Sequence, residues 1–540
     1  MPTDPPSPEP GAPGWRYLGA ALALTALIQI GLALRPSAVA EDGLVFIGFT
    51  RGFARAPVAT MREKDQHPGY PIMILAGRWL AARFVGEGGV WSWVYGARLV
   101  SGICGLLSVP VLWLLVRRAF DARVAGVASI IFAGLPLFRQ NAADALSDTP
   151  HLLLYLLGAW MAAEGLVRRR FWWFPAAGLA SGLAYWIRPE GSGVALVAAA
   201  VLVLWAFTHR TMSWRRALAC LAGLLLSAAM VATPYIYLKG AFTVKKDITG
   251  VLWRQPHVQV PFTAPAARGV APGAEAAVGE RSAPVSRGHA LLNGCAKLAR
   301  EFLHRLRYVL ALALLLGLLA PRRSRAQAAP AFLFASLAAF HVVLLLWLYS
   351  TAGYISYRHT MPLAALAMPW IASGTICFSG VAATVVAAVW LHAQPSRSVG
   401  PGLRRCVLGL TVGLLVLGML PRSLRPLRRQ RLPLVRAGSW VGERTSAGDS
   451  VLSNSLDVLF YADTPGRFVR PGDAIPEVQV PDGEPPYRFV VLDLRSRDLG
   501  KEWSAPLAER YAQETVPGVF GADSGILLFR ARSSQPSTPP

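Results

Sequence analysis

Residues 18–34 read LGAALALTALIQIGLAL, an apolar run without charge, and the carboxylates Glu41 and Asp42 follow it in the segment AEDG at 40–43. A helix needs about 20 mainly apolar residues to cross a bilayer, so this run predicts a first membrane span over 18–35. The connection after it continues into EKDQHPGYP at 63–71. Acid, base and imidazole side chains thus share one segment, which indicates either a chemical site or an ordinary solvated acidic loop.

Composition places the whole chain in the membrane class. Hydrophobic residues make up 54% of the 540 residues and charged residues only 16%, which is too apolar for a soluble globular protein. The formal net charge of +24 would suggest nucleic-acid binding in a soluble protein. Here the basic residues lie between apolar runs, which is typical of membrane topology, and we therefore expect no nucleic-acid partner. The five cysteines show no disulfide or metal-binding spacing.

Eleven apolar runs predict an all-α polytopic membrane protein. We expect spans over 18–35, 92–116, 124–138, 150–167, 172–187, 191–208, 217–238, 307–320, 330–349, 361–391 and 404–421. The run at 361–391 could form one tilted helix or a pair of short ones. We favour one helix, because the 392–405 connection is basic, although the arginines between 422 and 431 would favour the pair.

Alternate connections between these spans are short and basic, which predicts their side of the membrane. Cytoplasmic loops are rich in Lys and Arg, so the segment carrying Asp42 is expected on the non-cytoplasmic side. The supporting arginines are Arg117, Arg118, Arg123, Arg168, Arg169, Arg170, Arg210, Arg215, Arg216, Arg322, Arg323, Arg325, Arg397, Arg404 and Arg405.

The predicted organisation has a polar N-terminal tail at 1–17, a membrane domain at 18–421 and a small C-terminal α/β module at 437–534. Within the first outer loop, 36–91, the stretch 70–80 is expected to form an interfacial helix. The outer segment 239–306 contains an Ala/Pro/Gly-rich run that indicates a mobile loop. In the C-terminal module, strands are expected at 451–453, 487–494 and 525–530, with a short helix at 456–461.

Several ionisable residues occur where spans meet the outer face. Such groups are costly at membrane depth and usually line a cavity or form pairs. A single ionisable residue of this kind would be interpreted as an ordinary helix cap or as a side chain that reaches into water. Several such sites on one face favour a shared function. They are Asp144 and Asp148 before 150–167, Arg188 and Glu190 between 172–187 and 191–208, and Tyr357, Arg358 and His359 after 330–349.

The order of these motifs resembles the GT-C membrane glycosyltransferases. It comprises a first-loop acid, His-Pro-Gly-Tyr-Pro at 67–71, Asp-Thr-Pro at 148–150, Arg-Pro-Glu-Gly at 188–191 and Tyr-Arg-His-Thr-Met-Pro at 357–362. Within that superfamily the chain is similar to family 39, which includes the protein O-mannosyltransferases and the aminoarabinose transferase of lipid A. The resemblance implies inverting transfer of a sugar from a polyprenyl-phosphate carrier to an acceptor on the non-cytoplasmic face.

The resemblance also implies roles for individual residues. Asp42 matches the family's general base, with Glu41 as the reserve, since an attacking hydroxyl must lose its proton. Asp148 matches an acceptor-side or positioning acid, and Asp144 lies beside it in the sequence.

The remaining candidates would bind the donor phosphate or support the cavity. Arg358 would neutralise the departing phosphate. His67 stands where many relatives have lysine, so Lys64 could supply that charge instead. Lys245 and Lys246 would approach the phosphate from the outer loop. Cavity support is expected from Arg188, Glu190, His359 and Tyr357.

These expectations include the partners and the location. We expect a multi-pass protein of a bacterial inner or cell membrane that contacts the lipid bilayer, a polyprenyl-phosphate-linked sugar and an acceptor glycan, lipid or protein. No Asp-x-Asp pair lies in the first loop, so no obligatory metal is expected, with divalent-metal dependence left open. The alternatives are a transporter or lipid flippase, in which these charges bind a passing substrate, and a non-catalytic envelope assembly protein. No internal repeat of the kind common in transporters is evident.

Overall fold

The computed structural model describes residues 14–35, 37–86, 88–209, 212–242, 287–319, 328–390, 400–446, 448–469, 487–495, 507, 511–521 and 525–532. The N-terminal half contains α1 (Gly14–Ala33), α2 (Glu41–Arg55), α3 (Pro57–Glu63), α4 (Gly69–Val85), α5 (Gly89–Ala119), α6 (Ala122–Gly134), α7 (Pro136–Ala142), α8 (Asp148–Arg168), α9 (Trp173–Ile187), η1 (Pro189–Gly191), α10 (Ser192–His209) and α11 (Trp214–Lys239). The rest of the membrane part contains α13 (Arg287–Arg305), α14 (Val309–Leu319), α15 (Ala328–Ala352), η3 (Tyr357–Thr360), α16 (Met361–Trp390) and α17 (Pro401–Ser423).

Every apolar run predicted to be a span contains a helix, and the protein is an integral multi-pass membrane protein. Among the described residues, eight helices are long and apolar enough to cross a membrane, or up to ten if two bent pairs each count as one span. The pairs are α6 with α7, bent by 59°, and residues 291–305 of α13 with α14, bent by 105°. Of the eleven expected spans, this count leaves out only 172–187. That run forms α9, whose 15 residues extend only about 22 Å.

The run at 361–391 forms one helix, as favoured above. α16 has 30 residues with Pro369 inside it, a length of about 45 Å that exceeds the apolar thickness of a bilayer and requires tilting. α14 packs closely against it, because a Cβ on Gly317 would lie 1.7 Å from the Trp370 carbonyl oxygen and one on Gly374 would lie 1.7 Å from that of Ala313. Small residues at helix contacts allow this approach.

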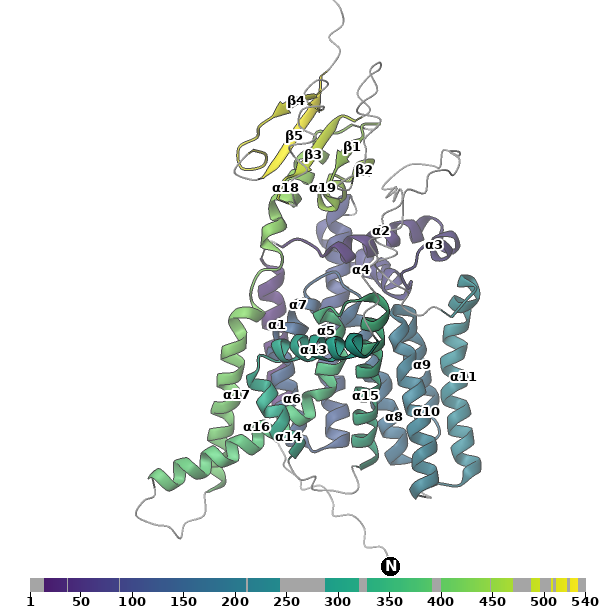
Figure 1. The fold of residues 1–540 in the computed structure, drawn as a ribbon, viewed down its shortest axis with the longest axis vertical. Helices are drawn as coiled ribbons and strands as arrows, with labels where there is room; N and C mark the ends of the chain where they lie inside the picture. The colour runs from purple at the N-terminus through teal and green to yellow at the C-terminus, as the bar shows by residue number, and fades with distance from the viewer. Residues whose placement is uncertain are drawn as a thin grey trace, which may run out of the picture.

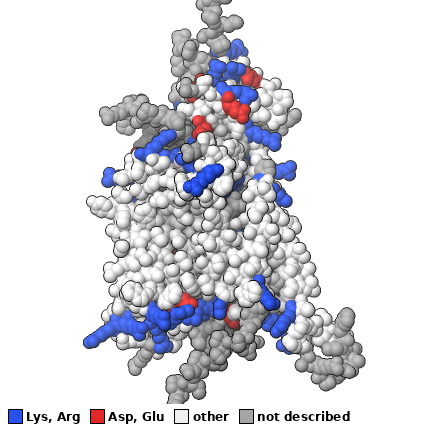
Figure 2. All heavy atoms as spheres, turned by 180° about the vertical axis from the view of Figure 1, so that it is seen from behind, with Lys and Arg blue, Asp and Glu red and all other residues white. Residues whose placement is uncertain are grey.

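Charged side chains lie at the two ends of the bundle, separated by a broad uncharged belt (Figure 2). One end carries a dense band of Lys and Arg side chains and corresponds to the connections after α5, α8 and α10. Glu164, inside the predicted span 150–167, lies in this band and pairs with Arg118 at 3.3 Å and with Arg168 at 2.5 Å. The opposite end carries α2, α3 and α4 (Figure 1).

The segment containing Glu41 and Asp42 is helical rather than a loop. Both carboxylates lie in the first turn of α2, where the partial positive charge of the helix N-terminus stabilises them. α3 follows after Ala56, and the expected interfacial helix is α4. A Cβ on Gly77 would lie 2.4 Å from the Gly96 carbonyl oxygen, which shows how closely α4 approaches α5.

The C-terminal module lies at the same end as α2–α4 (Figure 1). After η4 (Arg429–Arg431) it contains α18 (Leu432–Gly442), β1 (Val451–Ser453), α19 (Leu456–Ala462), β2 (Gly466–Phe468), β3 (Phe489–Asp493), β4 (Tyr511–Glu514) and β5 (Ile526–Ala531). The strand order is β2-β1-β3-β5-β4, with β1 parallel to β2 and β3, and β5 antiparallel to β3 and β4. β1, β3, β5 and α19 match the predicted elements, whereas β2 and β4 carried too weak a pattern to be predicted.

Candidate active site

Asp42 and Arg358 form an ion pair that joins the first loop to a distant turn. The Arg358 guanidinium donates to the Asp42 carboxylate across 316 residues of sequence. Asp42 is held by the first turn of α2, and Arg358 by η3, which precedes α16. The Asp42 side chain is 48% exposed and that of Arg358 is 22% exposed, so the carboxylate remains open to solvent on the outer side of the pair.

Three further charged residues extend this pair into one cluster. The Asp148 side chain, only 5% exposed, accepts a hydrogen bond from Arg188 and lies 3.9 Å from Arg358. Arg188 Nε lies 3.6 Å from a Glu190 carboxylate oxygen. Asp42, Arg358, Asp148, Arg188 and Glu190 therefore alternate in charge, and we call them the charge cluster. They come from α2, η3, α8, η1 and the residue preceding η1.

The carboxylates keep both arginines of the charge cluster cationic. Arg358 lies between the carboxylates of Asp42 and Asp148. Burial opposes the charge of Arg188, but Asp148 and Glu190 outweigh it and raise the pKa of Arg188 above its ordinary value. Three carboxylates and two guanidinium groups leave a formal charge of −1. The cluster can thus offer a carboxylate as a base and a guanidinium as an anion ligand.

Asp144 does not join the charge cluster. It is 1% exposed, and Arg428 donates to its Oδ2. Its Oδ1 accepts from the backbone amides of Ala40 at 3.2 Å and Ala145 at 2.8 Å. The bond to Ala40 holds the backbone two residues before Asp42, and the acceptor or positioning role of Asp144 stays a prediction.

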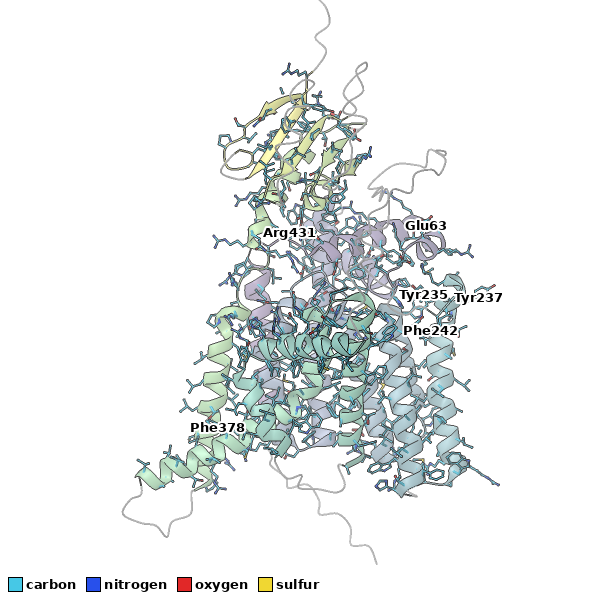
Figure 3. All side chains as sticks on the ribbon, in the orientation of Figure 1. Glu63, Tyr235, Tyr237, Phe242, Phe378 and Arg431 are labelled. Carbon is cyan, nitrogen blue, oxygen red and sulfur yellow. The ribbon has the colours of Figure 1, made fainter. Side chains whose placement is uncertain are left out.

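Glu41 points toward the C-terminal module. Its carboxylate is 68% exposed and lies 3.3 Å from Arg431. Arg431 Nε also donates to the buried Asp457 of α19 at 2.6 Å, and burial raises the pKa of Asp457 to about 6 against the opposing effect of Arg431. Figure 3 shows Arg431 where the chain enters the module. Glu41 therefore helps to connect α2 to the module.

His67 is neutral at pH 7 in this fold. Its Nδ1 lies 2.6 Å from the Tyr185 carbonyl oxygen, and burial lowers the pKa of the ring to about 4. The Tyr185 and Tyr235 rings pack against it, with centroids 5.1 and 4.9 Å away. Phe242 stacks on Tyr185 at 5.1 Å, and Figure 3 shows Tyr235 and Phe242 together at the outer end of α11. A neutral imidazole lacks the positive charge expected at this position.

Lys64 lies half-buried between α3 and α4. Its carbonyl oxygen accepts from Lys239 Nζ at 2.7 Å, and Lys239 also lies 3.8 Å from Asp65. Lys239, the last residue of α11, thus connects that helix to the segment containing Lys64 and His67. The other two lysines expected to bind phosphate, Lys245 and Lys246, lie outside the described residues.

Tyr357 and His359 shape the turn that carries Arg358. The imidazole of His359 accepts from the Ser356 amide at 3.3 Å as part of a capping box around η3. The His359 carbonyl oxygen lies 2.8 Å from Nε2 of His341 on α15. The guanidinium carbon of Arg305, at the end of α13, lies 4.0 Å from the centre of the Tyr357 ring. These contacts hold the turn that carries Arg358, and the cavity-supporting role of both residues stays a prediction.

Sequence reasoning missed the residues that anchor the site from a distance. The sequence analysis used Arg428 and Arg431 only as evidence on topology, and it did not single out Lys239 or Arg305. The only sequence feature that could have identified these residues is a positive charge next to a helix end. Many other residues of the chain have the same feature. In the described ranges no group of three or more His, Cys, Asp and Glu residues could hold a metal ion.

Comparison with known proteins supports the resemblance found in the motifs. The family model of dolichyl-phosphate-mannose-protein mannosyltransferase matches residues 71–237. The apo crystal structure of ArnT from Cupriavidus metallidurans is 16% identical, with a TM-score of 0.58 over 96% of this chain and 98% of that one. Its structure with undecaprenyl phosphate gives 17% identity and 0.56 over 97% and 99%. No curated protein sequence matches the chain. The chain thus resembles the GT-C glycosyltransferases in its motifs, and its fold is GT-C-like.

Proposed function

We propose that this GT-C-fold membrane protein transfers a sugar from a polyprenyl-phosphate carrier to an acceptor on the non-cytoplasmic side, inverting the anomeric centre. The observation that carries the proposal is the ion pair of Asp42 with Arg358 inside the charge cluster. A base for the acceptor and a cation for the leaving phosphate must lie on opposite sides of one anomeric carbon. Here the two groups, Asp42 and Arg358, are 316 residues apart in the sequence and meet at one place in the fold.

The ion pair suggests how the two groups would divide the work. Arg358 is held between Asp42 and Asp148. A phosphate-linked donor would compete for the guanidinium, because phosphate oxygens form strong charge-assisted bonds with arginine. Arg358 would then turn toward the phosphate and leave Asp42 free to accept the proton of the acceptor hydroxyl. Developing negative charge on the phosphate would strengthen its bond to Arg358 in the transition state.

Asp148 and Arg188 would keep this geometry in place. Asp148 is almost fully buried and bonded to Arg188, so its charge remains near Arg358 whether or not the donor is bound. The bound undecaprenyl phosphate of the ArnT crystal structure supports a polyprenyl-phosphate donor for this chain. The family model supports a sugar transferase in preference to a transporter or an assembly protein.

The test is transfer from a labelled polyprenyl-phosphate sugar by the purified protein. Asp42→Asn keeps the size of the side chain but cannot accept a proton at neutral pH. Turnover should fall roughly 10²–10⁴-fold, the usual contribution of general acid–base catalysis. Donor binding should not weaken, because the variant removes the carboxylate that competes with the phosphate for Arg358. Glu41→Gln is the matched control, because Glu41 faces Arg431, and it should retain transfer. Loss of transfer in Glu41→Gln alone would move the base to Glu41, and normal transfer in both variants would contradict the mechanism.

A further inference from the structure

A second concentration of positive charge lies apart from the charge cluster. A cavity of about 250 Å³ is lined by Pro136, Leu137, Gln140, His304, Arg305, Arg307, Arg422 and Arg425. Four of these eight residues are arginines, one is histidine, and none is acidic. In the part of the chain that the structure describes, none of the four arginines forms an ion pair with a carboxylate. We call this cavity the arginine pocket.

Local backbone geometry places the α13 side of the arginine pocket. Between α13 and α14 the chain bends by 105°. Arg307 and Tyr308 adopt positive φ angles of 61° and 53° at the bend, a region that costs non-glycine residues energy and persists only where the surroundings hold it. Arg305 and Arg307 flank this bend. The Nε of Arg305 is buried without a hydrogen-bond acceptor among the described residues.

The α17 side of the arginine pocket is anchored by neighbouring helices. Gln140 donates to the Arg422 carbonyl oxygen at 2.8 Å, and Arg35 donates to that of Leu424. Ser423 donates to the Gly134 carbonyl oxygen at 2.7 Å. These bonds connect the end of α17 to α1, α6 and α7. The backbone that carries Arg422 and Arg425 is therefore fixed before any ligand arrives.

Both helices that lead away from the arginine pocket continue into the apolar belt. On α17 the exposed leucines Leu410, Leu414 and Leu417 recur at helical spacing before Arg422. On α14 the exposed Leu312, Leu315 and Leu319 follow Arg307 in the same way. A ligand with a charged head and apolar chains fits such a surface better than a soluble anion does. Guanidinium groups bind phosphate oxygens through charge-assisted hydrogen bonds, so the phosphate headgroup of a lipid fits the charge of this pocket.

We propose that the arginine pocket binds the phosphate headgroup of an anionic membrane lipid. The lining of the pocket shares no residue with the charge cluster, although Arg305 contacts Tyr357, the neighbour of Arg358. Phosphate oxygens would accept hydrogen bonds from the four guanidinium groups of the arginine pocket. The acyl chains would lie along the exposed leucines of α14 and α17. This inference does not depend on the proposed transfer reaction, because it concerns binding alone.

Native mass spectrometry of the full-length protein in detergent tests the proposal. Phosphatidic acid, phosphatidylcholine and inorganic phosphate are the three probes. The double variant Arg422→Ala/Arg425→Ala should bind phosphatidic acid about 30-fold more weakly, with phosphatidylcholine binding unchanged. The Lys/Lys variant at the same positions should recover part of the affinity, because it keeps the charge. Inorganic phosphate should compete only weakly, since it lacks the chains.

Arg404→Ala/Arg405→Ala is the matched control, because these exposed arginines lie at the opposite end of the same helix. It removes the same charge and should keep the tight phosphatidic-acid site. An equal loss in the control would show general surface attraction and overturn the proposal. Tight competition by inorganic phosphate would overturn the lipid assignment. Unfolding of the double variant would be visible as a lower melting temperature, and the Lys/Lys variant would then decide the question.

Discussion

The guanidinium of Arg358 donates to the carboxylate of Asp42, so the proposed anion ligand and the proposed base are partners before any substrate binds. The pair holds both side chains in position. This arrangement prepares the site for a donor that replaces the carboxylate with a phosphate. Substitution of Arg358 and substitution of Asp42 should therefore have different effects on donor binding and turnover.

Arg358→Ala should weaken donor binding as well as turnover. Removing a charge-assisted bond to phosphate should reduce donor affinity roughly 10- to 100-fold. Arg358→Lys should be intermediate, because an ammonium group keeps the charge without the planar fork of arginine. Titration with a polyprenyl-phosphate sugar and single-turnover rates would measure both effects. Arg429→Ala, which removes an exposed arginine of η4, is the control, and equal donor affinity in Arg358→Ala would exclude a phosphate-binding role.

His67 should make the protein less stable in mild acid. The pKa of its ring is about 4 in the fold, below the 6.5 of an ordinary histidine. Between these values the unfolded chain binds a proton that the folded protein does not, so stability falls as pH decreases from 6.5 toward 4. The loss should reach about 3 kcal/mol at most.

Thermal unfolding in detergent from pH 7 to pH 4.5 would measure this effect. His67→Gln should lower the melting temperature at pH 7 and show a flatter decline with acid than the unchanged protein. His209→Gln alters an exposed histidine at the end of α10 and should leave the decline as it was. A decline in His67→Gln as steep as in the unchanged protein would contradict a neutral, buried His67.

Arg51 should couple the C-terminal module to the helix that carries Asp42. It is buried, contacts Asp463 at 2.6 Å and lies 5.6 Å from the Trp93 ring centre and 5.5 Å from that of Phe460. Arg51→Ala should destabilise this junction by roughly 1–3 kcal/mol and increase hydrogen exchange in α2 and α19. Arg55→Ala, which alters an exposed residue of the same helix, should change neither. Unaltered protection in Arg51→Ala would show that apolar packing alone joins the parts.

The side of the membrane can be tested with single cysteines. The five native cysteines would be replaced first, since Cys295, Cys377 and Cys406 are exposed. Cysteines at Asp65 and Arg444 should react with an impermeant thiol reagent in intact cells, because both lie at the end that carries α2–α4. A cysteine at Arg169 should react only after permeabilisation. The reverse pattern would place the proposed site in the cytoplasm and remove its access to an outer acceptor.

The sequence predicted the helices well because a bilayer restricts what can cross it. Every backbone amide and carbonyl in the apolar layer must be bonded within its own helix, so apolar runs such as 217–238 translate directly into helices such as α11. The 105° bend between α13 and α14 was not predicted from the sequence, whereas α9 ends at Ile187 because Pro189 disfavours a helical conformation at Arg188.

The sequence by itself predicted that four charged residues lie next to span ends on one face of the membrane: Asp42, Asp148, Arg188 and Arg358. Only the tertiary structure decided which of them meet. It paired Arg358 with Asp42 and Arg188 with Asp148, directed Asp144 to Arg428, and buried His67 in a neutral form. Hydropathy is a local property that a single segment carries, whereas an ion pair across 316 residues depends on how the helices between them pack. Burial, which sets the charge of His67, arises from that packing as well.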